Sequence, residues 1–268
     1  MKLTNSKEQL PPKEDALYFE VQSDLGITKH MGGRKATREL VELCNLKNGD
    51  YVLVVGCGVG TTPCYLAEKF GLRVVGIDIS EKMIERSKER AKRKGLETRI
   101  EFRVADAKNL PFKNDIFDAV ICESVTAFVG DKSKAVKEYA RVIKPQGFVG
   151  LNECLWIKTP PPELAEYTFR IMGGAKFLTS IGWKELLEGA GLTDIKVKNY
   201  RFNALSQFAE EIKQLDLRDY GNAWHRFLTQ GFSNPSYRRF AKEVLSSPKN
   251  IFKLFEYFGY GIYVGKKI

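Results

Sequence analysis

The chain has 268 residues, of which 43% are apolar and 28% are charged. A chain of this length and composition can bury a full hydrophobic core, which excludes a disordered or fibrous protein. Its 43 lysines and arginines exceed its 33 aspartates and glutamates, giving a net charge of +10. Charges of both signs are interspersed, so this excess indicates a solvated surface more than a nucleic-acid site.

The five cysteines and two histidines are spread along the chain without the spacing of a metal site, so we expect no bound metal. Unpaired thiols fit a reducing compartment, and we expect the protein in the cytoplasm. The N-terminal residues lack the apolar run of a signal peptide, and no stretch of about 18 apolar residues predicts a transmembrane helix. The sequence leaves a homodimer open.

The first strong local signal is a strand that runs directly into glycines. Residues 52–55 are all apolar and predict a buried strand. Gly56, Gly58 and Gly60 follow, and the missing Cβ atoms let backbone N–H groups approach a ligand. The spacing differs from the dinucleotide pattern Gly-x-Gly-x-x-Gly, because Thr61 stands where its third glycine would be. The stretch predicts a cradle for a nucleotide-type ligand.

Acids follow the next two predicted strands. Residues 73–79 predict a second strand that carries Asp78 near its end, and a helix follows over 80–94. A third strand over 100–105 is followed by Asp106. In an open parallel sheet, a carboxylate at the tip of the strand beside the glycine loop can bind the hydroxyls of a ribose. Asp78 therefore predicts an adenosine ligand.

Strands and helices continue to alternate along the rest of the chain. Further strands are predicted over 117–122, after a turn at 144–147, over 193–203 and over 259–266. Helices are predicted over 34–45, 131–143, 163–172 and 179–190. This alternation is typical of an α/β protein with a largely parallel sheet.

Four motifs in this order resemble class I S-adenosylmethionine-dependent methyltransferases, and the resemblance extends from about Leu40 to Leu192. They are the glycine loop, Asp78, the pair Asp106-Ala107 and the turn Lys144-Pro145-Gln146-Gly147. The resemblance implies one Rossmann-like α/β domain over 1–268, with seven mostly parallel strands and helices on both faces. The last strand is expected to insert antiparallel between the fifth and sixth, and the implied cofactor is S-adenosylmethionine.

The same resemblance implies where the cofactor binds. Asp78 is expected to bind the ribose, Asp106 and Ala107 the adenine, and Glu123 the region of the sulfonium. An N-terminal arm, residues 1–33, is expected to fold over the cofactor. The complete expected set is Tyr18, Gly33, Gly56, Cys57, Gly58, Gly60, Asp78, Ile79, Met83, Asp106, Ala107 and Glu123.

One position departs from the family pattern. The family usually carries an acid two residues before the first glycine, and this chain has Val54 there. That carboxylate ordinarily organises the loop beneath the methionine end of the cofactor. Its absence leaves the cofactor affinity open and keeps a non-catalytic S-adenosylmethionine-binding protein as an alternative.

The substrate side is expected in the stretch 205–257, which is too long for a simple hairpin between the last two strands. It is rich in aromatic residues and predicts a helical lid over the carboxyl edge of the sheet, where ligands bind. An aromatic lid favours a small apolar or ring-containing acceptor. Candidate general bases, needed only if the acceptor must lose a proton, are His30, Glu123 and Glu153. Glu153 could equally cap a neighbouring backbone.

An RNA methyltransferase is the other alternative, and the pI near 9.2 favours it. The stretch 122–125 nevertheless lacks the Asn-Pro-Pro-Tyr-like motif of nucleic-acid amino-methyltransferases. The similar residues Asn234-Pro235-Ser236-Tyr237 fall in the lid, where we expect a turn that ends a helix. The overall match resembles the small-molecule branch of the family, which contains quinone and sterol methyltransferases, and so favours methyl transfer to a small molecule.

Overall fold

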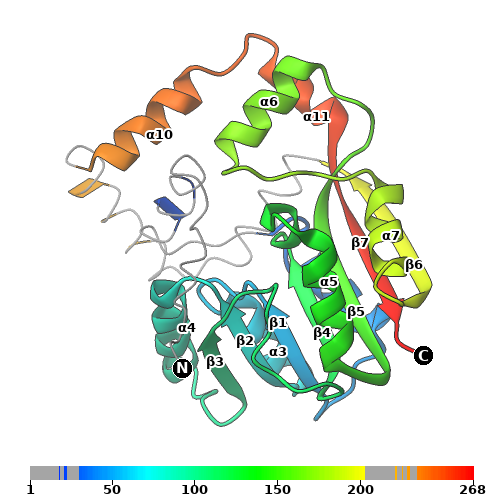
Figure 1. The fold of residues 1–268 in the computed structure, drawn as a ribbon. Coiled ribbons are helices and arrows are strands. Elements are labelled where there is room, and N and C mark those ends of the chain that lie inside the picture. The colour runs from blue at the N-terminus through cyan, green and yellow to red at the C-terminus, as the bar shows by residue number, and fades with distance from the viewer. Residues whose placement is uncertain are drawn as a thin grey trace, which may run out of the picture.

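The computed structural model describes Tyr18, Val21, Gln22, residues 30–202, Gly221, His225, Leu228, Thr229 and residues 234–268. Its centre is a seven-stranded sheet in the order β3-β2-β1-β4-β5-β7-β6 (Figure 1). The strands are β1 (Tyr51–Val55), β2 (Arg73–Asp78), β3 (Ile100–Val104), β4 (Phe117–Glu123), β5 (Ile143–Trp156), β6 (Thr193–Arg201) and β7 (Phe258–Lys266). Only the pairings of β7 with β5 and β6 are antiparallel. The predicted α/β fold and the insertion of the last strand are confirmed.

Helices cover both faces of this sheet (Figure 1). The described helices are α2 (Gly33–Leu43), α3 (Thr61–Phe70), α4 (Glu81–Arg93), α5 (Lys132–Val142), α6 (Pro162–Ile171), α7 (Ser180–Glu188), α10 (Pro235–Leu245) and α11 (Leu254–Tyr257), with short 3₁₀ helices η1 (Thr126–Phe128) and η2 (Ile251–Lys253). Leu53 and Val55 of β1 pack into a core with α5 and α7, whereas Val52 and Val54 pack into a second core with α2, α3 and α4. Because both faces are covered, β1 is apolar throughout instead of alternating.

Short polar residues fix where several helices begin. The Ser80 hydroxyl accepts a 3.3 Å hydrogen bond from the backbone N–H of Met83 at the start of α4. Asp131 accepts one from the N–H of Lys134 at 2.9 Å, at the start of α5. Such caps satisfy N–H groups that lack a partner in the first helical turn. The two caps place the helices where their apolar faces meet the sheet.

Two local expectations need correction. The fifth strand begins before the turn at 144–147, because Ile143 already pairs with Phe117 and pairing resumes where Phe148 meets Ala119. The intervening residues form an irregularity within β5, with Gln146 at a φ of 65°. Pro235 is the first residue of α10, so it begins a helix instead of ending one. Proline suits this position because the first helical residue needs no N–H partner.

The helices α6, α10 and α11 lie beyond the carboxyl end of β5 (Figure 1). An ion pair at 2.9 Å between Arg170 and Glu243 joins α6 to α10. Much of the expected lid, including residues 205–220, lies outside the described residues, as does most of the expected arm. In the parts that the structure describes, no helix is long and apolar enough to cross a membrane.

Candidate functional site

The loop between β1 and α3 has an open backbone at the carboxyl edge of the sheet. Gly56, Gly58 and Gly60 have φ values of 64°, 53° and 78°, a conformation that residues with a Cβ rarely adopt. A methyl group at Gly56 would also overlap the side chain of Val125. The backbone N–H of Cys57 donates to the carbonyl of Ile77 at 2.8 Å, which ties the loop to the adjacent strand. Glycine is therefore required here by both conformation and packing.

Asp78, at the tip of β2, is part of this loop structure. One carboxylate oxygen accepts the N–H of Gly58 at 2.9 Å, and the other accepts the N–H of Ser80 at 2.9 Å. Burial raises the pKa of Asp78, while these backbone hydrogen bonds oppose the shift. The carboxylate thus connects the glycine loop to the start of α4. Free lone pairs remain on its oxygens for a ligand.

An apolar surface borders Asp78. Ile79 is 71% exposed and Val104 is 51% exposed, at the ends of neighbouring strands. Met83, in the first turn of α4, is buried. Because Ile79 and Val104 are adjacent and lie beside Asp78, this surface can accept a flat apolar group.

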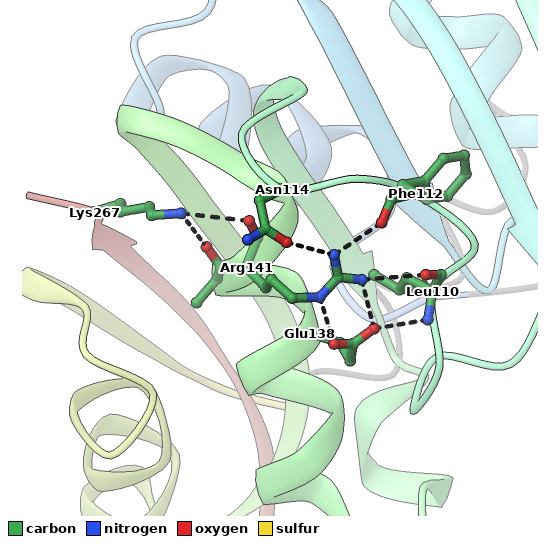
Figure 2. Close-up of polar contacts among 7 residues, drawn as sticks. Leu110, Phe112, Asn114, Glu138, Arg141 and Lys267 are labelled. Atoms are coloured by element: carbon green, nitrogen blue, oxygen red, sulfur yellow. Dashed lines mark hydrogen bonds and ion pairs between the residues drawn. The ribbon is translucent and has the colours of Figure 1, made fainter.

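The segment after β3 is held in a tight turn. Asp106 is partly exposed, and its carboxylate accepts the N–H of Lys108 at 2.9 Å. Ala107 is half-buried between them. Downstream, Arg141 of α5 donates to the carbonyls of Leu110 and Phe112 at 3.1 and 2.8 Å (Figure 2). Arg141 thus fixes the chain that follows the expected adenine-binding residues.

Glu138 completes this anchor. It binds Arg141 through two contacts, at 2.6 and 2.8 Å, and accepts the N–H of Leu110 at 2.8 Å (Figure 2). Bidentate pairing of a guanidinium with a carboxylate fixes both side chains in one geometry. The sequence analysis did not single out either residue, although their spacing of three on one helix was a usable signal.

Glu123 is the centre of a buried polar cluster at the end of β4. Its Oε1 accepts the hydroxyl of Thr37 at 2.9 Å, and its Oε2 accepts the hydroxyl of Thr62 at 2.8 Å. Nδ1 of His30 lies 3.3 Å from Oε1. Glu123 is 8% exposed, and burial of a carboxylate is tolerated because hydrogen-bond donors surround it. The structure brings two candidate bases, His30 and Glu123, into contact.

A cavity of about 30 Å³ lies beside this cluster. It is lined by His30, Val54, Val55, Gly56, Cys57, Thr61, Thr62 and Glu123. Val54, which stands where the family usually has an acid, therefore shares a cavity with the carboxylate of Glu123. In the sheet, Val55 pairs with Cys122, so Glu123 lies one residue beyond the end of β1. The neighbouring strand supplies a carboxylate that β1 lacks.

The end of the expected arm is attached to the sheet. The side-chain amide of Asn152 donates to the carbonyl of Met31 at 2.7 Å, and the N–H of Met31 donates to the Ser124 hydroxyl at 3.4 Å. Gly33 is the first residue of α2 and is buried. Tyr18 stacks on Phe128 with ring centroids 5.8 Å apart. Residues from β4 and β5 thus hold the arm against the site.

Glu153, the third candidate base, is placed differently. It is fully buried and accepts backbone hydrogen bonds from Val125, Thr126 and Ala127 at 3.1, 2.7 and 3.3 Å. Burial raises its pKa to about 7. These contacts match the backbone-capping alternative that the sequence left open. Glu153 is not among the residues that line the cavity beside Glu123.

Sequence reasoning missed Thr37, Thr62 and Asn152. The signal for Thr37 was a polar residue on the buried face of α2, and Thr62 follows the glycine loop directly. Asn152 follows the apolar residues Val149 and Leu151 in β5 and is fully buried. Within the described ranges, no three His, Cys, Asp or Glu side chains are grouped so that they could hold a metal ion.

Comparison with known proteins identifies the family. A model of the methyltransferase domain matches residues 53–151. Phosphoethanolamine N-methyltransferase 1 of Arabidopsis thaliana is 37% identical over 165 residues, which cover 61% of this chain and 33% of the relative. The chain thus spans about a third of that relative's length. The 27-O-demethylrifamycin SV methyltransferase of Amycolatopsis mediterranei is 32% identical over 144 residues, which cover 54% of this chain and 53% of the relative.

Other matches cover a greater share of the chain, and the solved structures among them have the same fold. An uncharacterised protein of Haemophilus influenzae is 30% identical over 186 residues, which cover 68% of this chain and 74% of the relative. The structure of the [4+2]-cyclase SpnF has a TM-score of 0.73 at 19% identity and covers 96% of this chain and 97% of its own. A methyltransferase of Thiobacillus denitrificans with bound S-adenosylhomocysteine has a TM-score of 0.69 at 19% identity, covering 97% and 100%. The match to the methyltransferase domain and the named relatives show that the chain belongs to the class I S-adenosylmethionine-dependent methyltransferases, and the solved structures agree in fold.

Proposed function

We propose that this protein transfers a methyl group from S-adenosylmethionine to a small, apolar or ring-containing metabolite. The observation that carries the proposal is the buried cluster of Glu123, Thr37, Thr62 and His30 beside the glycine loop. It gives the methionine end of the cofactor a carboxylate partner although Val54 removes the usual one.

The adenosyl part would lie along the tips of β2 and β3. Asp78 would bind the ribose hydroxyls through its remaining lone pairs, and Ile79 would cover one face of the adenine. Asp106 and Ala107 would recognise the edge of the base. The glycine loop, with Gly56, Cys57, Gly58 and Gly60, would lie against the methionine part, and Met83, Gly33 and Tyr18 would close around it.

Glu123 would bind the ammonium group of the methionine part. The hydroxyls of Thr37 and Thr62 occupy two of the roughly four lone-pair positions of its carboxylate, which leaves the others for an ammonium. A charge-assisted hydrogen bond in a buried site is among the stronger polar contacts in proteins. Glu123 therefore replaces in space the acid that the family usually carries on the first strand.

Methyl transfer needs alignment more than acid or base chemistry. The positive charge on sulfur disappears as the new bond forms, so the protein must hold acceptor, methyl carbon and sulfur in line and exclude water. Where the acceptor must lose a proton, we assign this role to His30. Its Nδ1 lies 3.3 Å from Oε1 of Glu123, a carboxylate that would stabilise the imidazolium formed when the ring takes the proton.

An aromatic cluster supports the acceptor class. Trp156 and Phe177 lie 5.3 Å apart, Phe177 and Phe258 5.5 Å, and Phe258 and Phe202 5.7 Å, measured between ring centroids. They gather where β5 and β6 end and β7 begins, near α6 and near α11 of the expected lid. Phe177 and Phe258 are buried, so the partly exposed rings of Trp156 and Phe202 are the ones that a flat or apolar molecule would meet. The residues of the lid, 205–257, would cover it.

The experiment is to incubate the protein with S-adenosylmethionine labelled in the methyl group and with fractions of a cell extract. We expect label in a small organic-soluble product. Transfer to phosphoethanolamine, named in several relatives, would replace the apolar acceptor with a polar amine, and transfer to RNA would support the nucleic-acid alternative. Binding of S-adenosylhomocysteine without transfer to any fraction would support the non-catalytic alternative. The five described cysteines are unpaired, which favours a reducing compartment, and we infer the cytoplasm.

A further inference from the structure

The segment 124–129, here called the strap, connects β4 to α5 and contains η1. Near its start, Val125 packs so closely on Gly56 that no Cβ fits there. Near its end, the ring of Phe128 stacks on Tyr18 of the arm, with an interplanar angle of 16°. The strap therefore touches both the glycine loop and the arm, the two segments expected to enclose the cofactor.

Glu153 holds the beginning of the strap. Its carboxylate accepts the successive N–H groups of Val125, Thr126 and Ala127 at 3.1, 2.7 and 3.3 Å. These are N–H groups of the first turn of η1, which have no partner within so short a helix. An anion at this end also matches the direction of the peptide dipoles.

Lys132 holds the end of the strap. Its Nζ donates to the carbonyl oxygens of Ala127 and Val129 at 2.8 and 2.9 Å. The strap therefore lies between a buried anion and a half-buried cation, each bonded to backbone groups. Burial disfavours both charges, lowering the pKa of Lys132 to about 8 and raising that of Glu153. Apolar residues at positions 132 and 153 would fill the same space without the cost of burying charge. What the two polar side chains add is their hydrogen bonds to the backbone of the strap.

We propose that Glu153 and Lys132 are positioning residues that fix the strap and, through Val125 and Phe128, the glycine loop and the arm around the cofactor. This inference rests on the proposed function. In this role Glu153 acts through the backbone of residues 125–127 and does not contact the reacting atoms. Loosening either end should weaken cofactor binding and leave the rate at saturating cofactor nearly unchanged.

The test compares Glu153→Gln and Lys132→Met with Asp118→Asn. Gln keeps the volume of Glu153 but offers one acceptor in place of two, so buried N–H groups lose partners. Asp118 is a matched control, because it too accepts a backbone N–H, that of Tyr51 at 2.8 Å, and pairs with Lys144 at 2.7 Å, but at the opposite end of β4.

The first readout is hydrogen–deuterium exchange of the peptide that covers residues 124–129 in the free protein. The second is the dissociation constant of S-adenosylhomocysteine by calorimetry. We expect Glu153→Gln and Lys132→Met each to accelerate exchange in the strap and weaken binding by about tenfold, while Asp118→Asn changes neither. Lys132→Arg keeps the cation and should restore part of the affinity.

Unchanged exchange and affinity in both variants would overturn the inference. So would a loss of kcat at saturating cofactor with unchanged affinity in Glu153→Gln, because that result would make Glu153 a base. If Glu153→Gln does not fold, Lys132→Met carries the test at the other end of the strap. If the wild-type protein does not bind S-adenosylhomocysteine, the proposed function is wrong. Hydrogen–deuterium exchange of the strap in the free protein would then still test whether Glu153 and Lys132 fix the strap.

Discussion

The hydroxyl of Thr62, in the first turn of α3, donates a 2.8 Å hydrogen bond to the carboxylate of Glu123 at the end of β4. This contact fixes the glutamate beside the glycine loop, in the cavity that Val54 also lines. The carboxylate is thus oriented before any ligand arrives. A preoriented group loses less conformational freedom on binding, so it contributes more to affinity.

The position of Glu123 predicts a rescue experiment. Glu123→Gln should weaken the binding of S-adenosylhomocysteine at least about tenfold, since it removes the charge that would face the ammonium group in the proposed complex. Adding Val54→Asp to this variant should restore part of the affinity. In the wild-type background, Val54→Asp should instead lower stability, because two buried carboxylates would share one cavity. Calorimetry and thermal unfolding measure these effects, and equal affinity of wild type and Glu123→Gln would refute the assignment.

Asp78 and Asp106 should act on the other end of the cofactor. We expect Asp78→Asn and Asp106→Asn to weaken the binding of methylthioadenosine, which has the adenosine part but no amino or carboxyl group. Glu123→Gln should leave this ligand unaffected. Asn at position 78 can still accept the N–H of Gly58, so the glycine loop should persist. Loss of methylthioadenosine binding in Glu123→Gln would show that this variant disturbs the whole site.

Gly56 tests the packing of the loop. Gly56→Ala should destabilise the protein, because Ala would adopt a φ of 64° and overlap Val125. The backbone part costs about 1–2 kcal/mol. Val125→Ala in the same chain should relieve the overlap but not the backbone cost. Urea unfolding of the single and double variants measures both parts, and an unchanged free energy of unfolding in Gly56→Ala would contradict the structure.

Arg141 should contribute measurably to stability. Arg141→Ala removes the pairing with Glu138 and leaves the carbonyls of Leu110 and Phe112 without their donor (Figure 2). We expect a loss of about 2 kcal/mol in the free energy of unfolding. Lys184→Ala, which breaks an exposed pair with Glu188 at 2.6 Å, is the control and should cost less than about 1 kcal/mol. Similar losses in the two variants would contradict the anchoring role.

Glu153 predicts a pH dependence of stability. Its ordinary pKa of 4.5 is raised to about 7 in the folded protein by burial. Between these values the folded state holds a proton that the unfolded chain has released, so the free energy of unfolding falls as pH rises through this window. Urea unfolding at pH 5 and pH 8 should show the wild type losing up to about 3 kcal/mol more than Glu153→Gln. Parallel pH profiles would exclude the raised pKa.

The role of Glu153 shows where sequence reasoning reached its limit. The sequence placed it at the end of the fifth strand but left it as either a base or a backbone cap. Its three N–H partners lie 26 to 28 residues away along the chain. These N–H groups belong to the segment that follows β4, and they meet the carboxylate only when that segment packs beside the end of β5.

The sequence by itself determined the parts of the protein that depend on local spacing. The apolar runs predict the strands of the α/β fold. The glycines at 56, 58 and 60 predict the ligand-binding loop, and the acids that directly follow strands predict that it lies at the edge of the sheet. Only the tertiary structure placed the carboxylate of Glu123 in the cavity that Val54 lines. Glu123 meets Thr62 and Thr37 across 61 and 86 residues of chain, and such contacts arise only when separate elements pack.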